Sequence, residues 1–183
     1  AAISPMENRG TRLRPAIFFD RDGTLNVDTH YLYKPEEFRW IEDAPAALRW
    51  ANGHGYLTVV VTNQSGVARG FYTEEDVEKL HRWMNERLGE SGAHIDAFYY
   101  CPHHPEGTVA KYRKNCDGRK PGTALVEEAC RVLHIDKSTS FFIGDAQRDM
   151  ECAARAGIRG VRYKGGSLLT ALLRGMECDE HGR

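Results

Sequence analysis

The chain has 183 residues, of which 41% are hydrophobic and 28% are charged, and its formal net charge is −1. This length predicts one domain with a sizeable core, and the near-neutral charge argues against nucleic acid or an anionic membrane as a partner. Because no apolar run approaches ~18 residues, no signal peptide opens the chain, and five cysteines lack a disulfide-type spacing, we expect a cytoplasmic protein with reduced thiols. A monomer is expected as well.

The first apolar run of the chain, residues 16–19, predicts a strand that is buried on both faces, as in a parallel sheet. It ends at D-R-D-G-T, residues 20–24, where two carboxylates lie one residue apart in front of a glycine. Open α/β sheets place their chemistry at the carboxyl ends of their strands, so Asp20 and Asp22 are candidate site residues. The alternative is a plain strand-to-loop junction, because Asp and Gly are common turn residues.

Four further apolar or β-branched runs predict strands, at residues 56–61, 95–100, 140–143 and 160–163. Segments with helical spacing separate these strands. The first two helices should begin after the candidate cap Asp43 and at the capping-box pattern of Thr73 and Asp76. Two more should begin at Pro121 and after Asp145, and a last helix is expected near residues 168–173. This alternation predicts an α/β fold of three layers, a Rossmann-like parallel sheet with helices on both faces. The polar stretches 1–14 and 176–183 are expected to be tails of one domain over residues 15–175.

Polar groups follow three of the predicted strands: Asp20 and Asp22, then Thr62 and Asn63, then Asp145. Because the carboxyl ends of parallel strands lie at one edge of a sheet, these groups should meet there. They suit the hydrolysis of phosphate monoesters, which enzymes accelerate by as much as ~10²¹-fold, mostly through positioning and neutralisation of charge. A carboxylate cannot attack an anionic phosphate without a cation between them, and Mg²⁺ bound by carboxylates meets that need. We therefore expect a nucleophile (Asp20), a proton shuttle (Asp22), a metal ligand (Asp145), and phosphate contacts from Thr62, Asn63 and Lys120.

In this order, the motifs resemble those of the haloacid dehalogenase-like phosphatases: D-x-D-G-T at 20–24, T-N at 62–63, Lys120, and G-D-x-x-x-D at 144–149. Longer strings are similar to those of the heptose 1,7-bisphosphate phosphatases, to which the N-terminal domain of histidinol-phosphate phosphatase is also similar. These strings are residues 19–26, 62–70, 101–105 and 116–121. The resemblance covers about residues 16–160, and no insertion is long enough to form a large cap domain.

The resemblance implies an Mg²⁺-dependent phosphatase of a phosphorylated sugar, acting in the synthesis of heptose precursors through an aspartyl-phosphate. Asp20 would attack phosphorus, and Asp22 would protonate the leaving oxygen and then activate water. Mg²⁺ would be bound by Asp20, by the backbone carbonyl of Asp22 and by Asp145, while Thr62 and Lys120 steady the phosphoryl group. The implied substrate contacts are Asp28, Thr29, His30, Tyr31, Asn63, Gln64, Ser65 and Arg119, the last for a second phosphate.

The chain departs from this pattern at two positions. The structural zinc of the family has Cys-x-His and Cys-x-Cys ligands. Here Cys101, His103 and Cys116 match, but Gly118 stands at the last ligand position, so Zn²⁺ is left open. In close relatives a lysine follows the metal-binding aspartate, and Ala146 stands here, which removes one expected phosphate contact.

Four alternatives are weighed against this prediction. A histidinol-phosphate phosphatase is the alternative within the enzyme class, and a catalytically weakened binding protein on the same fold is the alternative outside it. A receiver-type signalling domain is disfavoured, because those domains carry the phosphorylated aspartate later, on the third strand. A P-loop kinase would need G-x-x-x-x-G-K-[ST], which this chain lacks. For Asp149 two interpretations stay open, a solvent-facing helix position and a place beside the metal.

Overall fold

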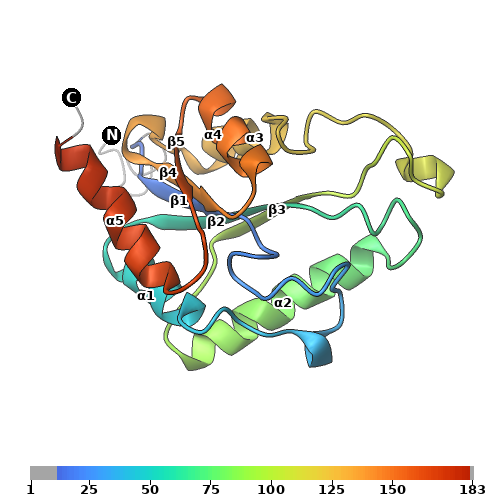
Figure 1. The fold of residues 1–183 in the computed structure, drawn as a ribbon, viewed down its shortest axis with the longest axis horizontal. Helices are drawn as coiled ribbons and strands as arrows, with labels where there is room; N and C mark the ends of the chain where they lie inside the picture. Colours follow the sequence, from blue (N-terminus) through green and yellow to red (C-terminus); the bar gives the residue numbers. More distant parts are fainter. Residues whose placement is uncertain (1–11, 182–183) are drawn as a thin grey trace, which may run out of the picture.

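Five parallel strands form one sheet, in the order β3-β2-β1-β4-β5 (Figure 1). The computed structural model describes the backbone of residues 12–181 and the side chains of residues 12–177. The strands are β1 (Ala16–Phe19), β2 (Leu57–Asn63), β3 (Ala97–Cys101), β4 (Phe141–Gly144) and β5 (Arg159–Arg162). β1 and β4 are buried at every position, which explains their unbroken apolar sequences.

Helices cover both faces of the sheet, so the predicted three-layer α/β fold is confirmed (Figure 1). One face packs against α1 (Ala44–Gly53), α2 (Glu74–Glu90) and α5 (Leu168–His181). The other packs against α3 (Ala124–Leu133) and α4 (Gln147–Ala156). β1 serves both layers, since Ile17 and Phe19 point to the first core and Phe18 to the second. Among the described residues, no helix is both long and apolar enough to span a membrane.

The prediction of a C-terminal tail from residue 176 is corrected, because α5 continues through Gly175 to His181. Leu168, Leu172 and Met176 recur every four residues and lie against the first core, so packing outweighs the low helix propensity of glycine. Gly175 also lets α5 approach β5 closely, since a Cβ there would lie 2.8 Å from a methyl of Val161.

The start of α3 and the place of Arg14 also differ from the prediction. α3 begins at Ala124 rather than at Pro121. Arg14 was expected in the N-terminal tail, but its backbone bridges to Ile135, donating to the carbonyl of His134 and accepting from the N–H of Asp136. The rest of that predicted tail, residues 1–11, lies outside the described residues.

Asp43 caps a different helix from the one expected. Its side chain makes no cap hydrogen bond to α1. It accepts instead from the N–H groups of Leu168 (2.9 Å) and Leu169 (3.1 Å) and from the Ser167 hydroxyl, at the start of α5. Partial burial raises the pKa of Asp43, but these hydrogen bonds outweigh it and leave the pKa below its ordinary value. The carboxylate therefore joins the start of α5 to the segment just before α1.

We predict that Asp43→Ala lowers the free energy of unfolding by about 1 kcal/mol at pH 7. Because the pKa is lowered in the folded state, this stabilisation is complete above the unfolded pKa of about 3.9 and is lost as the pH falls from there through the lower folded pKa. Urea unfolding at pH 7 and pH 3 measures both effects, with the neighbouring exposed residue in Glu42→Ala as control. An equal loss at both pH values would contradict the assignment.

Candidate active site

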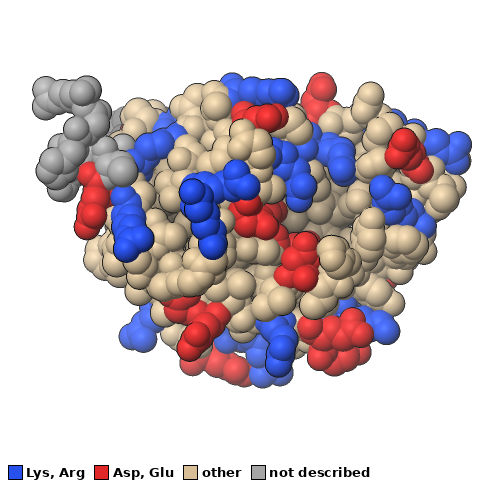
Figure 2. All heavy atoms as spheres, viewed as in Figure 1, with Lys and Arg blue, Asp and Glu red and all other residues tan. Residues whose placement is uncertain are grey.

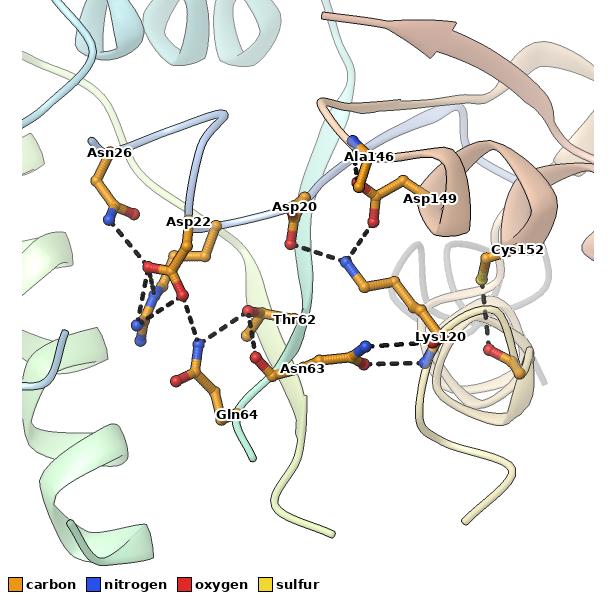
Figure 3. A network of polar contacts seen from close by, with 12 residues as sticks. Asp20, Asp22, Asn26, Thr62, Asn63, Gln64, Lys120, Ala146, Asp149 and Cys152 are labelled. Atoms are coloured by element: carbon orange, nitrogen blue, oxygen red, sulfur yellow. Dashed lines mark hydrogen bonds and ion pairs between the residues drawn. The ribbon is translucent and has the colours of Figure 1, made fainter. Parts of the chain in front are cut away.

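Figure 3 shows Asp20, Asp22, Thr62, Asn63 and Lys120 together at the carboxyl edge of the sheet. Asp145 belongs to the same cluster, because one of its carboxylate oxygens lies within 4.8 Å of a carboxylate oxygen of Asp20. Asp20 follows β1, Thr62 and Asn63 end β2, and Asp145 follows β4. β1 lies between β2 and β4, so the three strand ends are neighbours. Lys120 reaches the same place from the loop before α3, although it is 100 residues from Asp20 in the sequence.

Lys120 is buried between two carboxylates. Its Nζ lies 2.8 Å from Asp20 Oδ1 and 2.6 Å from Asp149 Oδ1, and the three side chains are at most 5% exposed. Burial lowers the pKa of Lys120, but the two carboxylates outweigh it and raise the pKa, so the lysine is charged. Burial raises the pKa of Asp20 above its usual range, although the charge of Lys120 opposes the shift. Of the two interpretations of Asp149, the structure therefore supports the position inside the site.

The carboxylates outnumber the lysine, and two of their oxygens lack a protein partner. Asp20, Asp145 and Asp149 each place a carboxylate oxygen within 4.8 Å of the others. Asp20 Oδ2 and Asp145 Oδ1 are buried and have no hydrogen-bond partner among the described residues. Buried anionic oxygens of this kind are costly unless a cation binds them, and carboxylate oxygens are the ligands that Mg²⁺ prefers. The residues present therefore fit Mg²⁺.

Asp149 differs from the other two carboxylates, because both of its oxygens are used by the protein. Oδ1 accepts from Lys120, and Oδ2 accepts from the backbone N–H of Ala146 at 3.1 Å. Asp20 and Asp145 thus keep the free carboxylate oxygens that a cation would bind. Gly23, with φ +87°, packs its backbone so closely on Asp145 that a Cβ would clash with the carboxylate. This contact places the backbone that follows Asp22 beside the Asp145 carboxylate.

The carboxylate of Asp22 is held by donors on both oxygens. Oδ1 accepts from Arg21 Nε (3.1 Å) and Asn26 Nδ2 (3.0 Å). Oδ2 accepts from Arg21 Nη2 (3.2 Å) and Gln64 Nε2 (3.1 Å). Sequence reasoning missed Arg21 and Asn26, although both lie within four residues of Asp22, because nothing in their spacing shows where they point.

Two predicted substrate residues use their amides inside the protein. Asn63 donates to the backbone carbonyl of Lys120 (3.2 Å) and accepts from its N–H (2.9 Å), which fixes the backbone that carries the lysine (Figure 3). Gln64 donates to Thr62 Oγ1 (2.9 Å) as well as to Asp22, and it accepts from the hydroxyl of Tyr72 (2.6 Å). Both residues still line the cleft, but the structure gives their amides a positioning role.

A polar cleft of about 230 Å³ opens beside these groups. Most of the expected substrate residues line it: Asp28, His30, Tyr31, Asn63, Gln64, Ser65 and Arg119, but not Thr29. Three further lining residues, Arg69, Tyr72 and Arg148, were not among the predicted contacts, although Arg69 lies within the matching string 62–70. Lysine and arginine side chains gather beside the hollow on the face shown in Figure 2. Burial lowers the pKa of Arg119, and the charges of Arg148 and Arg69 act in the same direction. The cleft is thus suited to an anion.

The predicted zinc ligands also lie together, in the loop after β3. One ligand atom from each of Cys101, His103 and Cys116 lies within 4.8 Å of the others. Gly118 contributes only its N–H, which donates to Cys116 Sγ at 3.4 Å. His104, a candidate for the fourth ligand, is used elsewhere, since its Nδ1 accepts from the N–H of Glu106 at 3.0 Å.

Comparison with known proteins agrees with this geometry. The Hydrolase-like family, described as HAD-hydrolase-like, matches residues 118–181. D-glycero-beta-D-manno-heptose-1,7-bisphosphate 7-phosphatase of Rhodopseudomonas palustris is 47% identical over 152 residues, which are 83% of this chain and 84% of that protein.

Two solved structures share the fold. A protein described as a HAD-like phosphatase from Mesorhizobium loti has a TM-score of 0.82 and 32% identity, covering 90% of this chain and 87% of that one. D,D-heptose 1,7-bisphosphate phosphatase from B. bronchiseptica, complexed with magnesium and phosphate, has a TM-score of 0.74 and 28% identity, covering 87% and 86%.

A parallel sheet that carries this set of aspartates, threonine and lysine at its carboxyl edge defines the HAD-like hydrolases. Within that class, the chain belongs to the family of D-glycero-beta-D-manno-heptose-1,7-bisphosphate 7-phosphatases.

We predict that Lys120→Met lowers the free energy of unfolding by about 3–5 kcal/mol in the presence of a chelator, because it leaves two carboxylates buried without their cation. Adding Asp149→Asn should restore part of the loss. Lys137→Met is the matched control, since Lys137 pairs with Glu127 at the surface and such pairs contribute about 1 kcal/mol or less. Equal losses from the two single variants, measured by urea unfolding, would contradict the buried ion pairs.

Proposed function

We propose that this chain is an Mg²⁺-dependent phosphoric monoester hydrolase that removes the C7 phosphate of D-glycero-D-manno-heptose 1,7-bisphosphate. The main support for the proposal is the environment of the two carboxylate oxygens of Asp20. Lys120 binds one of them, and the other is buried without a partner among the described residues. An oriented carboxylate with one free oxygen is suited to nucleophilic attack. The substrate class follows from the relatives, which are named for it.

The first chemical step transfers the phosphoryl group to Asp20. A bond forms between the Asp20 carboxylate and phosphorus as the bond from phosphorus to the sugar oxygen breaks. Asp22 gives its proton to that oxygen, so the sugar leaves as an alcohol. Lys120 and Thr62 steady the phosphoryl oxygens. Mg²⁺, held by Asp20, Asp145 and the backbone carbonyl of Asp22, would neutralise charge between carboxylate and phosphate.

The second step returns Asp20 to its starting form. Asp22, now ionised, accepts a proton from a water molecule as that water attacks phosphorus. The bond between phosphorus and Asp20 then breaks, and inorganic phosphate leaves. The two carboxylates therefore have different roles, set by their surroundings: Asp20 is the nucleophile, and Asp22 is first the acid and then the base.

A bisphosphate explains the basic side of the cleft better than a monophosphate does. Arg119 is half-buried, and its Nη1 has no hydrogen-bond partner among the described residues. A buried guanidinium donor is satisfied by a second phosphate, which arginine can bind through two parallel hydrogen bonds. Arg148 lines the same cleft two residues after Ala146, so the cleft retains a cation near the position at which the family resemblance implies a lysine. Histidinol phosphate, the alternative substrate, offers no second phosphate. A monomeric state and a cytoplasmic location stay predictions.

We predict that Arg119→Ala lowers kcat/KM for heptose 1,7-bisphosphate by about 10- to 100-fold, the value of a charged hydrogen bond of about 1.5–3 kcal/mol. The same variant should change kcat/KM for histidinol phosphate by about twofold or less. Phosphate release is measured with both substrates, with Arg131→Ala on the exposed side of α3 as matched control and Asp20→Asn as the inactive blank. Equal losses on both substrates would show that Arg119 does not recognise the second phosphate. A wild-type preference for histidinol phosphate would overturn the proposed substrate.

We also propose that Cys101, His103 and Cys116 bind zinc, more weakly than a site with four protein ligands. Two thiolates and an imidazole are zinc ligands, and structural sites normally have four. Gly118 can accept a side chain, since its φ is outside the left-handed region and an added Cβ would lie 3.4 Å from Cys116 Sγ. A thiol at this position would therefore start beside the existing ligands.

Gly118→Cys is predicted to tighten zinc binding, so that the metal survives a chelator concentration that strips the unmodified protein. Metal analysis before and after chelation, with the melting temperature as a second readout, measures the change. Gly118→Ser is the matched control, because it adds a side chain of the same size with a poor zinc ligand. One zinc per chain that survives chelation in the unmodified protein would show that Gly118 is fully compensated.

A further inference from the structure

Arg21, the middle residue of the D-x-D sequence, is among the largest fully buried side chains of the described chain. Its guanidinium makes contacts on three sides. Nε and Nη2 bind the two carboxylate oxygens of Asp22, and Nη2 also donates to the backbone carbonyl of Leu32 at 2.9 Å. Nη1 lies 3.2 Å from Nε2 of His81. Neither Arg21 nor His81 has a role in the two steps of phosphoryl transfer.

His81 lies on α2, on the helix face that packs into the sheet, and is only 4% exposed. Its ring stacks on that of Phe98, with centroids 4.3 Å apart and planes 13° apart. Arginine can only donate, so Nε2 of His81 must accept, and the ring proton then lies on Nδ1. Burial and the charge of Arg21 hold the pKa of His81 well below its ordinary value, which keeps the ring neutral. His81 is thus a fixed acceptor.

The guanidinium sets the direction of the Asp22 carboxylate. A planar fork that binds both oxygens defines the plane of the carboxylate, which the point charge of a lysine would not do. The remaining donors to Asp22 are amides, and Gln64 is itself fixed by Tyr72. Only the carbonyl of Leu32 and Nε2 of His81 hold the far side of the guanidinium, among the hydrogen bonds of the described residues. Loss of the His81 acceptor would let Arg21 turn and Asp22 turn with it.

We propose that His81 is a positioning residue for phosphoryl transfer: it fixes Arg21, which aims the carboxyl group of Asp22 at the leaving oxygen. The inference rests on the proposed function, because it takes Asp22 as the proton donor. A positioning role also predicts a difference between two substrates that a mere loss of stability would not produce. A sugar alkoxide is a poor leaving group and needs the proton, whereas 4-nitrophenolate leaves readily without one. Misaligned acid catalysis should therefore slow the sugar phosphate selectively.

The decisive variant is His81→Phe, which keeps a ring to stack on Phe98 and removes the acceptor. We measure kcat/KM, which reports the steps up to the covalent intermediate, for heptose 1,7-bisphosphate and 4-nitrophenyl phosphate. The first should fall about 10-fold, a part of the 10²–10⁴-fold that acid–base catalysis contributes, and the second about twofold or less. Arg21→Lys, which keeps the charge and loses the fork, should give the same split and serves if His81→Phe does not fold.

Two controls separate positioning from stability. His81→Gln places an amide oxygen near the position of Nε2 and should restore most of the activity on the sugar phosphate. Asn85→Ala, also on α2, removes two hydrogen bonds to the backbone of Ile95 and should lower the melting temperature without splitting the substrates.

Asp22→Asn removes the proton donor itself, so it serves as the reference variant. It should show the largest difference between the losses of kcat/KM on the sugar phosphate and on 4-nitrophenyl phosphate. If Asp22→Asn splits the substrates and His81→Phe slows both equally, the role of His81 is overturned while the proposed function stands. If Asp22→Asn itself shows no split, the proton-donor assignment falls, and the inference falls with it.

Discussion

The structure depends on one buried lysine that lies among more negative charge than it can balance. Lys120 binds Asp20 and Asp149, while Asp145 adds a third carboxylate to the same cluster. Burying an excess of negative charge costs free energy. Such carboxylates are therefore stable only where the surrounding groups hold them in place and a cation can bind them. Adjacent strands bring Asp20 and Asp145 together, the first turn of α4 holds Asp149, and the amide of Asn63 fixes the backbone of Lys120.

Two aspartates one residue apart acquire different chemistry from this arrangement. Asp20 has one oxygen on Lys120 and the other without a partner among the described residues. Asp22 has donors on both oxygens, from Arg21, Asn26 and Gln64. A free oxygen suits a nucleophile, whereas a carboxyl group that is held in direction suits proton transfer. The difference comes from the side chains around each aspartate, since the residue type is the same.

The strands and the edge at which the site forms could be predicted from the sequence, because buried parallel strands are short, apolar and end in recognisable polar groups. Asp20, Thr62 and Asp145 could be placed because each stands at the carboxyl end of a predicted parallel strand. The amide contacts of Asn63 and Gln64 could not be predicted, because they depend on where a distant loop and Tyr72 pack. His81 occupies a helix position of the apolar face, so its sequence pattern indicates core and not a contact with Arg21. The polar composition after Gly175 predicted a tail, but Leu172 and Met176 pack on the first core and extend the helix to His181.

The central claim is that Asp20 carries the phosphoryl group during turnover. The most direct test is to quench the enzyme with acid during hydrolysis of the bisphosphate, reduce the acyl phosphate with borohydride, and sequence the peptide around residue 20 by mass spectrometry. We predict homoserine at position 20, which requires substrate and Mg²⁺ and does not form in Asp20→Asn. Full turnover with an unmodified Asp20, or trapping at Asp22 instead, would contradict the account.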